Sequence, residues 1–144
     1  MTRKINTIQL TRAQRQKLYG IRRRADPHEG CALLLGIFRE EEDTAVVIQV
    51  VEMENIAQSS ASFAIDPEQQ YRILTTASLN NLDLVAIFHS HPAPPRPSGH
   101  DLEFMAYNPC AWIIDGLLRD GRHAMRAYQF IEEQLHEVTI RIRG

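Results

Sequence analysis

Two histidines and an aspartate stand close together in the second half of the chain. His89 and His91 are one residue apart, and Asp101 lies ten positions after His91. Imidazole nitrogens and carboxylate oxygens are ordinary zinc ligands, and three protein ligands leave one position of a tetrahedral ion open for water. An open position is typical of a catalytic zinc site, whereas structural sites hold four protein ligands. The three residues therefore predict a catalytic zinc centre.

The surrounding sequence places these residues at the end of a strand. The apolar run 82–88 leads directly into His89, and ligand sites in α/β sheets collect beyond the carboxyl ends of strands. Residues 92–97 include four prolines, which exclude regular structure because proline fixes φ and removes an N–H donor. A short helix is expected to begin near Ser98.

Each part of this pattern also has a simpler interpretation. On a strand, alternation points His89 and His91 to the same face, where histidines can be hydrogen-bonded core residues. Ser98 and Asp101 have the spacing of a capping box at a helix start, with aspartate in place of the usual glutamate. The convergence of these features within thirteen residues, beside a proline-rich loop, favours the metal site.

Hydrophobic periodicity along the chain predicts helices that alternate with strands, an α/β arrangement. Thr11 and Asp66 are suited to cap helices, and Pro67 fits the first helical position. Strands 31–38 and 44–53 flank an acidic turn and are expected to form a hairpin, and the last two strands are expected to be antiparallel. The expected strands are 6–10, 31–38, 44–53, 82–88, 111–118, 123–131 and 135–142, with helices over 11–25 and 66–80 and a polar loop over 55–64.

The composition is that of a small globular protein. The 144 residues are expected to form a single domain, and 44% apolar and 24% charged residues are ordinary globular usage. No apolar run approaches the length of a membrane span and no signal segment is recognisable, so cytoplasm is the expected location, without a membrane partner. Cys31 and Cys110 lack the spacing of a thiolate metal site. Cys31, inside an apolar strand, is interpreted as a buried hydrophobe rather than a nucleophile.

Positive charge is concentrated near the N-terminus. Half of the sixteen Lys and Arg residues precede position 25, which is compatible with an acidic or nucleic-acid partner. The same arginines also fit the solvated face of an amphipathic helix whose inner face carries Leu18, Ile21 and Ala25. Aromatic residues do not alternate with the arginines, as a platform for single-stranded nucleic acid requires. The helix interpretation is favoured, and no nucleic-acid partner is predicted.

The motifs around the histidines resemble the signature of the JAMM/MPN+ zinc metalloproteases, in their small stand-alone prokaryotic type. A second half of the resemblance lies about sixty residues upstream, where Glu29 stands at the head of an apolar strand ending in Leu-Gly. The likeness covers about residues 5–130. One departure is that nine residues separate His91 from Asp101, where the family usually has ten. The missing residue is expected to fall in loop 93–97 and to leave the ligands intact. The motifs are His89-Ser90-His91-Pro92, Ser98-x-x-Asp101, Asn55-Ile56-Ala57 and Phe63-Ala64-Ile65-Asp66-Pro67.

The resemblance implies a fold and a set of roles. The fold is the cytidine-deaminase-like JAMM/MPN fold, a mixed central sheet flanked by helices, formed by residues 1–144 as one domain. His89, His91 and Asp101 would bind Zn²⁺. Glu29 would act as general base on the bound water, and the Ser98 hydroxyl would stabilise the oxyanion.

The implied activity is cleavage at the C-terminus of a ubiquitin-like or sulphur-carrier β-grasp protein. Two other functions share part of this pattern. A zinc nucleobase deaminase needs H-x-E and P-C-x-x-C, and the sequence has Pro109-Cys110 but isoleucine at position 113. A non-catalytic scaffold is the alternative function, although the chain has every ligand type and the glutamate. The sequence does not decide which modifier or adduct is cleaved, nor the oligomeric state.

Overall fold

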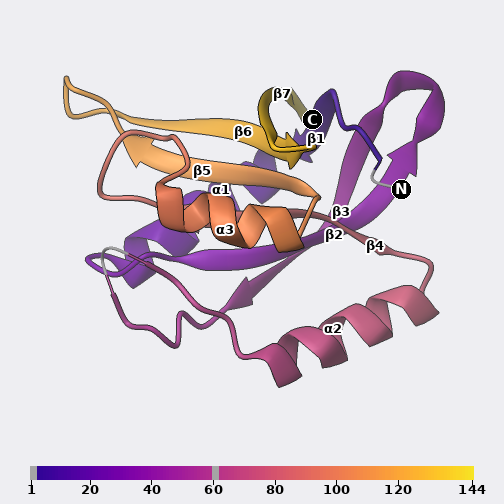
Figure 1. The fold of residues 1–144 in the computed structure, drawn as a ribbon, viewed down its shortest axis with the longest axis horizontal. Helices are drawn as coiled ribbons and strands as arrows, with labels where there is room; N and C mark the ends of the chain where they lie inside the picture. Colours follow the sequence, from indigo (N-terminus) through magenta and orange to yellow (C-terminus); the bar gives the residue numbers. More distant parts are fainter. Residues whose placement is uncertain (1–2, 60–61) are drawn as a thin grey trace.

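The computed structural model of the chain describes residues 3–59 and 62–144, and within them it is a mixed α/β fold (Figure 1). The helices and strands alternate much as the periodicity predicts, with boundaries that differ by a few residues. Positions 60 and 61 of the expected polar loop lie outside the described residues. The elements are β1 Thr7–Thr11, α1 Arg12–Ala25, β2 Cys31–Arg39, the 3-10 turn η1 Glu40–Glu42, β3 Thr44–Met53, α2 Pro67–Leu79, β4 Asp83–Ser90, α3 Gly99–Tyr107, β5 Ala111–Leu117, β6 His123–Ile131 and β7 Gln134–Arg143.

The strands form one sheet in the order β1-β3-β2-β4-β5-β6-β7, which closes into a barrel. The expected hairpin of β2 and β3 is confirmed as antiparallel, and so is the pairing of β6 with β7. Closure comes from β1, which pairs in parallel with β3 on one side and with β7 on the other. The sequence correctly predicts a mixed α/β fold, but the sheet closes into a barrel, where a mixed central sheet flanked by helices was expected.

The helices begin where their capping residues predict. Gln14 N donates to Thr11 Oγ1 and Thr11 N donates to Gln14 Oε1, a capping box that starts α1. Asp66 caps α2, with Pro67 in the first turn. No helix in residues 3–59 and 62–144 is long and apolar enough to cross a membrane.

The sheet separates two apolar cores. One contains Leu18 and Ile21 of α1, and the other contains Met105 of α3. Alternating residues of β2 enter both, so the strand is buried on its two faces, which explains its continuous apolar sequence. Cys31 is fully buried in the second core, as predicted.

The register of β2 against β4 brings the two distant halves of the sequence motif together. The strands are antiparallel, and Cys31 at the start of β2 lies opposite His89 near the end of β4. Glu29 lies two residues before β2 and His91 directly follows β4, so both are at the same edge of the sheet. Glu29 and the two histidines, about sixty residues apart in the sequence, are therefore neighbours in the folded chain.

Candidate metal centre

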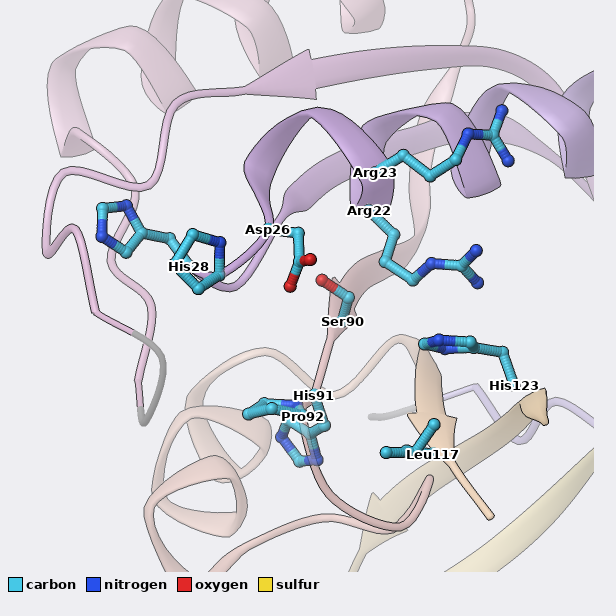
Figure 2. Close-up of a pocket in the computed structure, with 10 residues that line it drawn as sticks. Arg22, Arg23, Asp26, His28, Ser90, His91, Pro92, Leu117 and His123 are labelled. Atoms are coloured by element: carbon cyan, nitrogen blue, oxygen red, sulfur yellow. The ribbon is translucent and has the colours of Figure 1, made fainter. Parts of the chain in front are cut away.

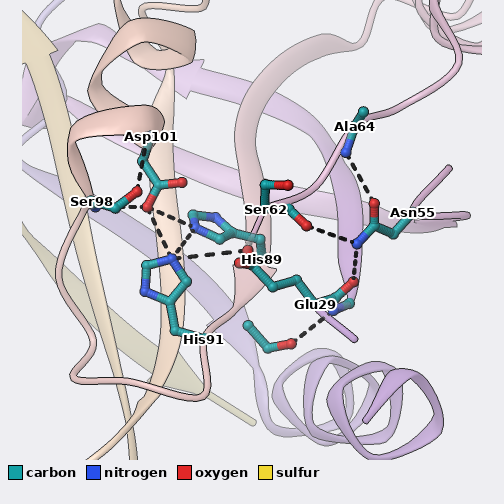
Figure 3. Close-up of polar contacts among 10 residues, drawn as sticks. Glu29, Asn55, Ser62, Ala64, His89, His91, Ser98 and Asp101 are labelled. Carbon is teal, nitrogen blue, oxygen red and sulfur yellow. Dashed lines mark hydrogen bonds and ion pairs between the residues drawn. The ribbon is translucent and has the colours of Figure 1, made fainter. Parts of the chain in front are cut away.

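The three expected ligands meet at this edge of the sheet, as Figure 3 shows. His89 Nε2 lies 2.9 Å from His91 Nε2 and 3.2 Å from Asp101 Oδ2, and His91 Nε2 lies 2.9 Å from Asp101 Oδ2. Three donor atoms thus face one point, although one ligand comes from β4, one from the following residue and one from α3. The shortened spacing between His91 and Asp101 has not separated them.

The donor atoms fit a single small metal ion. Ligand atoms about 2.0–2.1 Å from a tetrahedral zinc lie about 3.3–3.4 Å from one another, slightly more than the 2.9–3.2 Å found here. Two imidazole nitrogens and one carboxylate oxygen suit zinc and several other first-row metals. The geometry therefore supports a metal site formed by these residues, and the donor types do not by themselves select zinc.

Glu29 approaches the same point from the other side. Its Oε1 is 3.9 Å from His91 Nε2, and donor atoms of Glu29, His89 and His91 all lie within 4.8 Å of one another, a second grouping able to hold a metal. Asp101 completes the tighter set, because its Oδ2 lies 2.9 Å from His91 Nε2, closer than Glu29 Oε1 does. Glu29 is only 2% exposed, and its Oε1 has no hydrogen-bond partner among the described residues. A buried carboxylate oxygen without a partner is expensive, which indicates that a bound group completes the site.

The ionisable groups influence one another strongly. Burial raises the pKa of Glu29 to about 7; nearby His91 opposes this shift and Asp101 adds to it. Burial also acts to raise the pKa of Asp101, but hydrogen bonds with His89 and His91 outweigh it and hold that pKa well below its usual range. Burial lowers the pKa of His89, which favours the neutral imidazole that a metal requires.

His91 differs from His89 in its balance of effects. Burial acts to lower its pKa, but the hydrogen bond and charge of Asp101, with a further contribution from Glu29, raise it overall. Two nearby carboxylates thus give the metal-free site an affinity for positive charge. A divalent cation bound between these groups would supply that positive charge.

Asp101 is held by the start of α3. Ser98 N donates to Asp101 Oδ2 at 2.8 Å, and Asp101 N donates to Ser98 Oγ at 3.1 Å, a complete capping box. The capping interpretation and the ligand interpretation are therefore compatible, because the capping carboxylate is also the one that lies beside His89 and His91. His100 is exposed and packs edge-on against Phe104, so it is directed away from the ligands.

Aromatic rings and backbone hydrogen bonds fix the histidines. The ring of His89 stacks on Phe63, with centroids 4.7 Å apart, and meets Trp112 edge-on at 5.8 Å. His91 N donates to the carbonyl oxygen of Asp115 at 2.7 Å. Phe63 belongs to one of the motifs that resemble the JAMM/MPN+ family. The sequence did not predict that its ring would pack against His89.

Two polar residues organise the Glu29 segment and were missed as contributors to the site. Asn55 Nδ2 donates to the carbonyl oxygen of Glu29 at 3.0 Å and to that of Ser62 at 3.2 Å. Gly30 N donates to Ser90 Oγ at 2.8 Å. Asn55 and Ser90 belong to the sequence motifs that resemble the family. Nothing else in the sequence indicates that they support the site.

A cavity of about 350 Å³ lies beside His91, between the end of α1 and the ends of β4 and β5. Figure 2 shows Arg22 and His123 on one side of it and Asp26 and His28 on the other. Arg22 was expected in solvent, but its Nη1 donates to Asp115 Oδ2 at 2.7 Å, and Asp115 is fully buried. A buried carboxylate needs a compensating charge, so one arginine of the basic run turns inward.

The arrangement does not support the other chemistries. Cys31 is buried, and burial raises the pKa of its thiol to about 12, so the thiolate of a nucleophile is disfavoured. Cys110 directly precedes β5, whose first residue pairs with Ala86, whereas His89 pairs further along with Ile114. The cysteine therefore stands at the opposite end of β5 from the ligands, unlike the cluster of a zinc deaminase.

Most of the chain matches one protein family. Residues 11–130 match the prokaryotic homologs of the JAB domain. The chain is also 45% identical over 69 residues to a desampylase of Pyrococcus furiosus, and the match covers 47% of this chain and 49% of the relative. The chain thus spans about half the length of the curated relative it matches.

The fold is similar to two solved solution structures. A protein from Desulfitobacterium hafniense superposes with a TM-score of 0.81 at 29% identity, over 95% of this chain and 93% of that one. A protein from Salinibacter ruber superposes with a TM-score of 0.61 at 27% identity, over 90% and 89% of the two chains.

Proposed function

Because the chain belongs to the prokaryotic homologs of the JAB domain, we propose that it is a zinc-dependent isopeptidase or peptidase of the JAMM/MPN+ type. The membership agrees with the family that the sequence motifs resemble. The observation that carries the proposal is the meeting of three donor atoms within 3.2 Å, beside a buried glutamate oxygen without a hydrogen-bond partner in the described chain. Residues 1–144 would act as one domain, in the cytoplasm.

His89, His91 and Asp101 would hold the ion, since they form the tighter donor set. Bound zinc lowers the pKa of a coordinated water to about 7 and polarises a carbonyl oxygen. Glu29 would take the proton from the attacking water and deliver it to the leaving amine, because its buried Oε1 lies 3.9 Å from His91 Nε2 and has no hydrogen-bond partner among the described residues. The Ser98 hydroxyl, whose oxygen already accepts from Asp101 N, would donate its own hydrogen to the developing oxyanion.

The substrate would be the C-terminal tail of a ubiquitin-like or sulphur-carrier β-grasp protein. The name of the Pyrococcus furiosus relative, desampylase, supports an enzyme that removes an attached group. A tail ending in glycines suits a recessed metal site, because its backbone can approach without side-chain clashes. Such a tail would be bound in extended form, with backbone hydrogen bonds to an adjacent loop or strand.

Cleavage assays with modifier fusions test this proposal. A β-grasp protein ending in Gly-Gly is joined to a protein lysine, to a second modifier or to cysteine, and a matched set ends in Ala-Ala. We expect the Ala-Ala tails to be cleaved about tenfold or more slowly, and unstructured peptides to be poor substrates. Equal cleavage of both tails would contradict a modifier-specific peptidase. No cleavage of any fusion by the zinc-loaded protein would favour the non-catalytic scaffold.

A further inference from the structure

The proline-rich loop between the ligands is attached to the neighbouring β5–β6 hairpin. Residues 92–97 connect His91 to Ser98, the cap residue of the helix that carries Asp101 (Figure 3). Leu117 N donates to the carbonyl oxygen of Ala93 at 2.8 Å. Together with the bond between His91 N and Asp115 O, this contact continues the pairing of β4 and β5 into the loop. The first half of the loop therefore has a fixed path.

The second half of the loop is held by a tyrosine from β6. Tyr128 Oη donates to the carbonyl oxygen of Pro95 at 2.9 Å. Pro95 is buried although Pro94 and Arg96 on either side are exposed. The hydrogen bond from Tyr128 therefore holds the one buried residue of segment 92–97 against β6.

Gly116 of β5 packs closely against the backbone of Ala93 and Pro95. A Cβ atom at this position would stand 2.3 Å from Pro95 N, 2.5 Å from Pro95 Cα and 2.6 Å from the carbonyl oxygen of Ala93. These atoms are all backbone, so no side-chain rotation can relieve the overlap. Any residue other than glycine therefore requires the loop to move away from β5.

We infer that Gly116 and Tyr128 are positioning residues for Asp101, acting through Pro95. The inference rests on the proposed metal site and adds two residues that do not belong to its ligand set. Only two residues separate Pro95 from Ser98, and one of them is Pro97, so the connection has little freedom to absorb a displacement. The capping box joins Ser98 rigidly to Asp101. The backbone of His91 is bonded to Asp115, and its ring is hydrogen-bonded to the backbone of Pro94, next to Pro95. A shift at Pro95 therefore changes the distance between the two ligands.

Zinc affinity measures this effect directly. The variants Gly116→Ala and Tyr128→Phe are compared with Gly99→Ala, whose added Cβ has no heavy atom within 4 Å, and with Tyr71→Phe, a 72% exposed tyrosine of α2. Affinity is obtained by competition with a chromophoric chelator, and ligand geometry from the absorption spectrum of the Co²⁺-substituted protein. We expect Gly116→Ala to weaken zinc binding about tenfold or more and Tyr128→Phe by several-fold, with an altered cobalt spectrum. Both controls should keep the parent values.

Peptidase kinetics then separate the inference from the proposed function. With zinc saturating, the two variants should lower kcat with little change in KM, because the substrate tail still binds while the metal geometry is disturbed. Parent affinity and parent spectrum in both variants would overturn the inference. Zinc-bound parent protein without peptidase activity would refute the proposed function but leave the affinity comparison valid. Should Gly116→Ala fail to fold, Tyr128→Phe, which removes one hydroxyl, decides the question.

Discussion

At the scale of single residues, Glu29 most clearly separates binding from catalysis. Its carboxylate is buried beside the ligands without belonging to the tightest donor set. We predict that Glu29→Gln retains zinc but lowers kcat by about 10²–10⁴, because the amide has the same shape and cannot accept the proton. Metal content and turnover of the purified variant measure the two effects. Full activity in this variant would show that another group acts as the base.

The same residue gives the metal-free protein a specific pH dependence. Burial raises the pKa of Glu29 from 4.5 to about 7, so its stabilising contribution is complete below pH 4.5 and is lost as the pH rises to about 7. We therefore predict that metal-free Glu29→Gln gains melting temperature relative to metal-free parent protein over this interval. Thermal unfolding at about pH 5 and about pH 8 measures the difference. An equal difference at both values would contradict a buried, destabilised carboxylate.

Residues with distinctive chemistry are easier to recognise in the sequence than the residues that position them. His89, His91 and Asp101 stand out because their donor types and spacing are unusual. Glu29 required the resemblance to a family, since an isolated glutamate before a strand carries no local signal. Asn55, Ser90 and the inward-turned Arg22 act through contacts that only the folded chain creates.

At the scale of elements, two capping boxes allow stability and catalysis to be distinguished. Thr11 caps α1 and Ser98 caps α3, each with reciprocal hydrogen bonds. We predict that Thr11→Ala and Ser98→Ala each destabilise the protein by about 1 kcal/mol. Only Ser98→Ala should also lower kcat, by about 10²–10³, through loss of an oxyanion donor. Denaturant unfolding and kinetics at saturating zinc measure both quantities. Similar turnover in the two variants would assign Ser98 a structural role alone.

Strands and helices were predictable wherever their signals are local. The β2–β3 hairpin follows from two apolar runs around an acidic turn, and α2 follows from Asp66 and Pro67. The two faces of β2 are both buried, which its uninterrupted apolar sequence already indicated. Boundaries shifted by a few residues because strand ends depend on the neighbouring strand.

At the scale of the whole molecule, closure of the sheet was the feature that the sequence did not predict. β1 is only five residues long, and its two parallel partners, β3 and β7, are far away in sequence. No local pattern specifies such pairing, since each partner is chosen by burial of the whole sheet. The closed sheet nevertheless holds β2, β4 and β5 together at the edge where His89, His91 and Asp101 meet, so the barrel supports the proposed metal site.

Zinc titration of peptidase activity tests the central claim most directly. Metal-free protein receives increasing amounts of Zn²⁺ while release of a Gly-Gly-terminated β-grasp protein from its adduct is followed by mass spectrometry. We predict that activity rises linearly and reaches a plateau at about one zinc per chain, because the three donors form one site with an open position. Metal-free protein of full activity, or a zinc-saturated protein that releases no modifier, would contradict the assignment as a zinc isopeptidase.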